Sequence, residues 1–186
     1  MKLLTSILVL VASSCALFQP PAATPPPPWP KLEASDFGAM RNVSKCAEVW
    51  FGGGLTADDV KLAQRRGVKS ILDLSFSGED LGFDLGRMCA DLGIALYDPN
   101  LIAPDALTDR NADIALDLFR DPARKPLLVA CSSGSNGAMY FALWRALDHD
   151  MPLEEALEEA RRSGMRPGPL ETYVQGQAER LTPRGE

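Results

Sequence analysis

The sequence has little of what a metal centre needs. It contains one histidine, His149, and four cysteines, none of them in a metal-ligand spacing. We therefore expect neither a metal site nor a cofactor. The chain also lacks a surplus of basic residues, since 19 lysines and arginines stand against 25 acidic residues, a formal net charge of −6. This charge argues against nucleic acid as a partner, because phosphate backbones are bound through basic patches.

The apolar run at the N-terminus is too short to span a bilayer, which takes about 20 apolar residues in a helix. This run, Leu3–Ala12, follows Lys2 and precedes the small residues Ser13 and Ser14. The order is typical of an export signal over residues 1–14. Removal of that segment deletes one lysine and no acidic residue, so the exported chain would carry a formal charge of −7.

The end of this signal, Val11-Ala12-Ser13-Ser14-Cys15, resembles the lipobox of bacterial lipoproteins, in which the cysteine is acylated and becomes the first residue. The resemblance implies a lipid anchor on Cys15, and Ala16 in place of an aspartate implies the outer membrane. Ala12 stands where the lipobox usually has leucine, so signal cleavage without lipidation is the alternative. We expect a cell-envelope protein on the periplasmic side, an outer-membrane lipoprotein held to the membrane by this anchor.

Residues 15–40 are rich in proline, with Pro25–Pro28, Trp29 and Pro30 in succession. Proline fixes φ and has no amide donor, so we expect neither helix nor strand here. In polyproline geometry the segment would extend by about 3.1 Å per residue and act as a tether. A ligand for a proline-recognition domain is the alternative. The folded domain is then expected over residues 41–182, followed by a tail over 183–186.

Beyond the tether, short apolar runs alternate with amphipathic segments, and glycine and proline separate them. The apolar runs predict strands over 48–51, 69–74, 94–97 and 125–130. Helices are expected from Thr56, over 81–92, from Thr108, and over 138–147, 153–162 and 169–181. This alternation predicts an α/β domain with a mainly parallel sheet of four to five strands flanked by helices.

The domain contains three cysteines, Cys46, Cys89 and Cys131, and an odd number of thiols cannot all pair internally. A disulfide between Cys46 and Cys89 stays open at this point, because sequence does not give the distance between their backbones. Cys89 falls on the apolar stripe of its predicted helix, which favours a place in the core.

Cys131 ends the most hydrophobic predicted strand and is followed by small residues up to the next helix. These residues are Ser132, Ser133, Gly134, Ser135, Asn136 and Gly137. A strand, a small-residue loop and a helix start can form an anion site, with amides pointing into the loop and the helix dipole adding positive charge. The same field favours the thiolate form of the cysteine. The alternative is a small buried cysteine followed by a tight Asn-Gly turn.

Three segments carry a family resemblance: Gly52–Thr56, Gly67–Leu74 and Val129–Gly134. They resemble the dual-specificity-like bacterial cysteine phosphatases, including the beta-lactamase-hydrolase-like phosphatase family, and the resemblance spans about residues 42–168. It implies a cysteine-phosphatase fold. It also implies Cys131 as the nucleophile and Asp98, on the loop after a strand, as the general acid, with Asp105 as a nearby competitor.

The loop departs from the family pattern, which reads histidine, cysteine, two residues, glycine, two residues, arginine. Ala130 replaces the histidine and Gly137 replaces the arginine. In such enzymes the arginine grips phosphoryl oxygens and offsets charge in the transition state, and loss of a comparable arginine costs roughly 10³- to 10⁵-fold in rate. Arg145 is two helical turns further on, too far to substitute. Arg41 or Arg166 could approach from elsewhere in the fold.

The sequence leaves three candidate functions open. The first is a catalytically impaired pseudophosphatase that binds phosphate, another small anion or an envelope protein. The second is an active phosphoester phosphatase that uses Cys131 and Asp98. The third is a sulfurtransferase-like protein that carries a persulfide on Cys131. The missing arginine favours the first, because the loop has lost its positive clamp.

Overall fold

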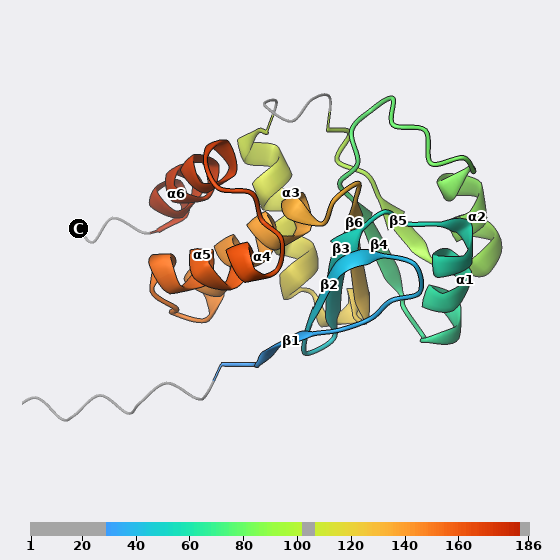
Figure 1. Cartoon of the computed structure of the whole chain (residues 1–186), viewed down its shortest axis with the longest axis horizontal. Coiled ribbons are helices and arrows are strands. Elements are labelled where there is room, and N and C mark those ends of the chain that lie inside the picture. Colours follow the sequence, from blue (N-terminus) through green and yellow to red (C-terminus); the bar gives the residue numbers. More distant parts are fainter. Residues whose placement is uncertain (1–28, 102–106, 183–186) are drawn as a thin grey trace, which may run out of the picture.

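A computed structural model describes residues 29–101 and 107–182 as one sheet with helices on both faces (Figure 1). The strands are β1 (Leu32–Ala34), β2 (Arg41–Cys46), β3 (Val49–Gly53), β4 (Ser70–Asp73), β5 (Ala95–Tyr97) and β6 (Leu127–Cys131). The helices are α1 (Ala57–Arg65), α2 (Leu85–Leu92), α3 (Asp109–Arg120), η1 (Pro122–Arg124), α4 (Ser135–Asp148), α5 (Leu153–Arg162) and α6 (Pro169–Leu181).

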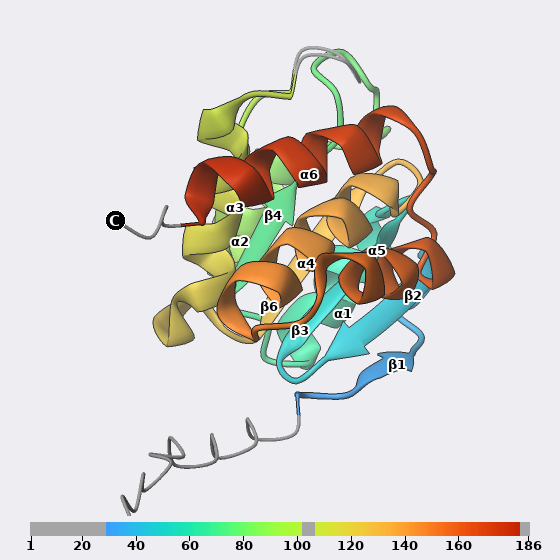
Figure 2. The same ribbon diagram turned by 90° about the vertical axis from the view of Figure 1, so that its left-hand side faces the viewer.

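The sheet has the strand order β1-β2-β3-β6-β4-β5. The four strands β3, β6, β4 and β5 run parallel, whereas β1 and β2 add an antiparallel edge. Helices α1 and α2 cover one face and α3 to α6 the other, as the two perpendicular views show (Figure 2). The expected α/β architecture with a mainly parallel, helix-flanked sheet is confirmed, and the antiparallel edge raises the number of strands to six.

The antiparallel edge moves the start of the folded domain ahead of the expected boundary at Arg41. Strand β1 pairs with β2 in the register Leu32 to Cys46. Phe37, which follows β1, is fully buried in the core on the α1–α2 side. The last proline of the rich stretch is Pro30, and past it the chain is free to supply amides to a sheet. Residues 15–28 of the expected tether lie outside the described part.

Two hydrophobic cores lie on opposite faces of the sheet. In β6 the side chains of Leu127, Val129 and Cys131 belong to the core on the α3–α6 side. Leu128 and Ala130 belong to the core on the α1–α2 side. This alternation follows from the two-residue period of a strand, and it makes β6 apolar on both faces.

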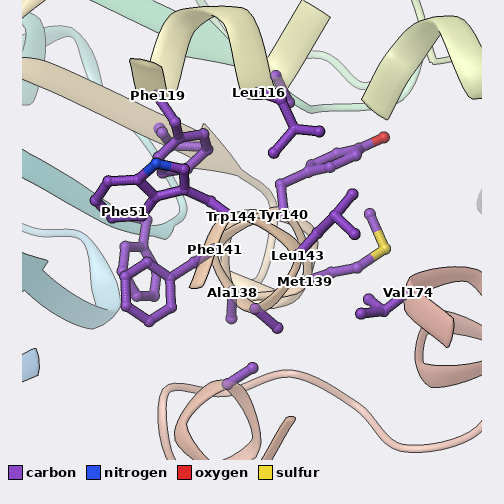
Figure 3. Close-up of a cluster of buried hydrophobic side chains, with 14 of the residues drawn as sticks. Phe51, Leu116, Phe119, Ala138, Met139, Tyr140, Phe141, Leu143, Trp144 and Val174 are labelled. Atoms are coloured by element: carbon purple, nitrogen blue, oxygen red, sulfur yellow. The ribbon is translucent and has the colours of Figure 1, made fainter. Parts of the chain in front are cut away.

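Helix α4 is buried on all sides along residues 135–145. Figure 3 shows its side chains radiating toward neighbours that include Phe51, Leu116 and Val174. The ring of Phe51 stacks on Phe141 with 4.8 Å between the ring centroids. A helix that is apolar all round belongs inside the protein. Because α4 begins four residues after Cys131, this packing fixes one end of the cysteine loop.

The predicted helix starts at Thr56 and Thr108 are confirmed. Each threonine hydroxyl accepts from the amide three residues on, and that residue's side chain, of Asp59 or Asn111, accepts from the threonine amide. Such reciprocal caps satisfy amides that a helix start leaves unpaired. Within the described residues, no helix is long and apolar enough to cross a membrane.

Candidate functional site

Cys131 is the last residue of β6, where the carboxyl ends of the parallel strands meet. Its flanking strands end at the same level, since Gly53 of β3 is its register partner and Asp73 of β4 is the partner of Ala130. Ligands of open α/β sheets bind beyond these strand ends. The cysteine is 2% exposed, so its sulfur lies beneath the loop that follows.

The loop turns sharply at Gly134, whose φ of +89° is in the left-handed region that favours glycine. The Gly134 amide donates a hydrogen bond to the sulfur of Cys131 over 3.1 Å. In the described part of the chain, the amides of Ser133, Asn136 and Gly137 have no hydrogen-bond acceptor. The first turn of α4 therefore presents free amide donors beside the cysteine, as the predicted anion site requires.

Gly137 occupies the position where the family loop has arginine, and it faces the core. A Cβ at this position would lie 3.2 Å from Cβ of Phe51 and 3.4 Å from a methyl carbon of Val129. Both neighbours are fully buried. A side chain at this position would therefore begin in tight contact with the packed space between α4 and the sheet, and its neighbours would have to shift by a few tenths of an ångström to admit even a Cβ.

A pocket of about 280 Å³ opens beside the loop. Its lining comprises Phe76, Ser132, Ser133, Ser135, Asn136, Arg166, Pro167, Pro169 and Leu170. The amide of Arg166 donates to the Ser135 hydroxyl over 2.8 Å, which fixes the α5–α6 connection against the start of α4. Arg166 is the cation in this lining, and Cys131 is not part of it. The pocket therefore lies against the loop and the start of α4, with Arg166 in its wall and Cys131 outside its lining.

The three arginines that could replace the missing loop arginine lie in different surroundings. Arg145 is 2% exposed and pairs with Glu159 through two hydrogen bonds of 3.0 and 3.2 Å, so it does not reach the loop. Arg41 does reach it, but its guanidinium donates to the carbonyl of Ser132 over 2.8 Å. Arg166 lines the pocket, and the salt bridges of the described residues do not include it. Of the three, only Arg166 is a lining residue of this pocket.

Asp98 is not a lining residue of the pocket beside the cysteine loop. It is exposed after β5, and its carboxylate accepts from the Asn100 amide over 2.6 Å in a local turn. It lines a separate pocket of about 350 Å³ that shares no residue with the loop pocket. Asp98 does follow a strand, β5, as the sequence predicts, and its role as general acid stays a prediction. Asp105 lies outside the described residues.

Cys46 and Cys89 belong to different cores, on opposite faces of the sheet, so the structure does not pair them. Burial raises the pKa of each thiol to about 11. Both are therefore expected to stay protonated and unreactive near neutral pH. Cys15 lies outside the described residues. In the described part of the chain, no cluster of three or more histidine, cysteine or acidic side chains could hold a metal ion.

Asn42 is a site residue that the sequence reading missed. Its side-chain amide donates to the carbonyl of Ser133 over 3.0 Å, across 91 residues of sequence. No local pattern marks it, because the contact exists only once β2 and the loop are side by side. Asn42 directly follows Arg41, which also reaches the loop. This neighbour is the one sign in the sequence that Asn42 belongs to the site.

No family model and no curated protein matches the sequence. Solved structures match the fold. P. aeruginosa TpbA gives a TM-score of 0.63 at 18% identity, over 81% of this chain and 95% of TpbA. Tk-PTP in its active form gives 0.62 at 18% identity, over 72% and 92% of the two chains. The core catalytic domain of the S. cerevisiae PP-IP phosphatase SIW14 gives 0.61 at 20% identity, over 73% and 85%. The fold is that of cysteine-dependent phosphatases.

Proposed function

We propose that this chain is an exported, lipid-anchored pseudophosphatase, which binds a small anion at the Cys131 loop and turns over phosphoesters poorly. One observation carries the proposal: Gly137, in the place of the loop arginine, is packed against Phe51. Loss of a comparable arginine lowers phosphoryl-transfer rates roughly 10³- to 10⁵-fold. The burial of Cys131 and the place of Asp98 in a separate pocket support the same conclusion.

Anion binding makes smaller demands than catalysis. Free amides at a helix start attract anions without any side chain, and Arg166 adds a full positive charge at the pocket. Fold relatives have been seen with anionic ligands, a TpbA variant with phosphotyrosine and SIW14 with citrate. These ligands support the class, a small anion, and leave its identity to experiment.

Two measurements on the purified protein test this function. Isothermal titration with phosphate and with tungstate should give binding that weakens in Arg166→Gln. Turnover of a generic aryl phosphate should not exceed that of a Cys131→Ser control. Turnover that depends on Cys131 would instead support an active phosphatase, and absence of anion binding would overturn the proposal.

A persulfide carrier is the remaining alternative, since amides around a sulfur also suit an anionic persulfide. Mass measurement of the Cys131 peptide after thiosulfate treatment separates the two functions. The proposed pseudophosphatase leaves this peptide unshifted. A mass increase of one sulfur atom would count for the carrier instead.

The lipid anchor is tested by expression in a Gram-negative host with radiolabelled palmitate. The wild-type chain should take up label and sediment with the outer membrane. Cys15→Ser should lose both, because the acylated thiol is gone. A wild-type chain that is unlabelled and released in soluble form would leave signal cleavage without lipidation as the correct alternative.

A further inference from the structure

Two adjacent side chains of β2 grip the cysteine loop from outside. The guanidinium of Arg41 donates to the carbonyl of Ser132 over 2.8 Å. The amide of Asn42 donates to the carbonyl of Ser133 over 3.0 Å. Both acceptors are consecutive carbonyls of the loop, so β2 holds two successive peptide groups.

The orientation of these carbonyls decides where the loop amides point. In a planar trans peptide the N–H points opposite to the C=O of the same group. A Ser132 carbonyl that points toward β2 therefore directs the Ser133 N–H away from β2. In the same way, a Ser133 carbonyl that points toward β2 directs the Gly134 N–H away from β2. The second case can be checked, because the Gly134 amide does meet the sulfur of Cys131 at 3.1 Å.

The local backbone is shaped to aim Asn42 at the loop. Its φ is +52°, a left-handed conformation that asparagine tolerates better than most residues. The β2–β3 register is irregular between Arg41 and Ser44, and such bulges redirect side chains. Gly134 and Gly164 leave space beside Asn42. A Cβ on Gly134 would lie 3.4 Å from Cβ of Asn42, and a Cβ on Gly164 would lie 3.2 Å from it.

We propose that Asn42, assisted by Arg41, is the positioning residue that keeps the loop amides directed at Cys131. Asn42 is not itself a lining residue of the pocket, and its side-chain amide bonds to the Ser133 carbonyl, so it acts through the Ser133–Gly134 peptide. With the donor removed, this peptide is free to rotate, and the thiolate loses the Gly134 hydrogen bond. The proposal rests on the proposed anion-binding function for its binding readout alone, and a readout of the Gly134 amide is independent of that function.

The test compares the full chain with Asn42→Gly and Asn42→Asp. Glycine keeps the left-handed backbone without the donor, and aspartate keeps the side-chain shape but presents acceptors to the Ser133 carbonyl. Hydrogen exchange of the Gly134 amide, followed by ¹⁵N NMR, reports its hydrogen bond to the sulfur of Cys131. In both variants this amide should exchange about tenfold faster than in the wild type, because the hydrogen bond to the sulfur is lost. Arg41→Gln, which removes the donor to the Ser132 carbonyl, should give a smaller increase, and Arg65→Gln, which changes an exposed arginine at the end of α1, is its matched surface control.

Tungstate affinity should fall about tenfold in Asn42→Gly, with a melting temperature close to that of the wild type. Unchanged exchange of the Gly134 amide in both Asn42 variants would overturn the positioning role. If Asn42→Gly does not fold, Asn42→Asp carries the same comparison. A wild-type chain that binds no tungstate defeats the anion-binding function, while exchange of the Gly134 amide still decides the role of Asn42.

Discussion

The α-carbon of Gly53, at the end of β3, lies directly against the backbone of Ser133 in the cysteine loop. A Cβ added at Gly53 would be 2.2 Å from the carbonyl carbon of Ser133 and 2.4 Å from the nitrogen of Gly134. Neither atom can move as a flexible side chain would. Glycine at this strand end therefore permits the close approach of two backbones, and the loop uses β3 as its floor.

Gly53→Ala should accordingly destabilise the fold, by about 3 kcal/mol, because overlap with backbone atoms has no cheap relief. Gly176→Ala is the matched comparison. Gly176 lies within α6 and a Cβ there meets nothing within 4 Å, so alanine should stabilise by about 0.5–1 kcal/mol. Urea unfolding followed by tryptophan fluorescence measures both values. Equal effects of the two substitutions would contradict the packing argument.

Gly137→Arg restores the family's loop pattern in sequence, but we expect it to restore no phosphatase activity. The new side chain would leave the backbone toward Phe51 and Val129 instead of toward an anion. Burial of a guanidinium among apolar side chains should cost several kcal/mol, on the order of 3 or more. Aryl phosphate turnover and urea unfolding of Gly137→Arg and Gly137→Ala check this. Turnover in the arginine variant that disappears with Cys131→Ser would show that the site can accept the clamp.

The parallel half of the sheet was predictable because each strand is a short apolar run that the sequence displays by itself. The antiparallel edge was not, since β1 has three residues and is defined only by its pairing with β2. In β2, Val43, Ser44 and Cys46 are buried around a register shift, which breaks the alternation that marks a strand. Helix α2 begins at Leu85 and not at the predicted residue 81, because Asp84 caps the helix.

The candidate site divides in the same way. The cysteine, the small-residue loop and the helix start are contiguous, so local sequence was enough to place them together. Asp98 and Asn42 depend on how separate elements meet, and that is a property of the packed fold. The spacing of Asp98 from Cys131 matched the family, yet the structure puts it in a different pocket. Spacing along a chain does not determine the distance between side chains in space.

The buried pair of Arg145 and Glu159 should matter more than any surface pair. The side chains are 2% and 14% exposed. Glu159→Gln keeps the shape and removes the charge, which leaves a buried guanidinium without its counter-ion and should cost about 3 kcal/mol. Asp58→Asn, which breaks the exposed pair with Lys61, is the control and should change the urea midpoint little. A loss in Glu159→Gln no larger than in the control would contradict this assignment.

His149 gives the fold a pH dependence that can be isolated, because it is the only histidine in the chain. Burial, then the positive charge of Arg145 and that of Lys125, lower its pKa from the ordinary value of 6.5, against the opposing charges of Asp148 and Asp150. The unfolded chain therefore binds a proton more readily than the folded one. Stability should be full above pH 6.5 and should fall as the pH drops through that value toward the lower folded-state pKa.

The urea midpoint of the wild type should decrease between about pH 7.5 and about pH 5.5, above the range in which carboxylates titrate. His149→Gln should flatten this decrease, because glutamine has no proton to gain. The comparison uses the slope of stability against pH, so a constant loss of packing in the variant does not affect it. An equal slope in both proteins would show that the imidazole is solvated well enough to protonate in the folded state.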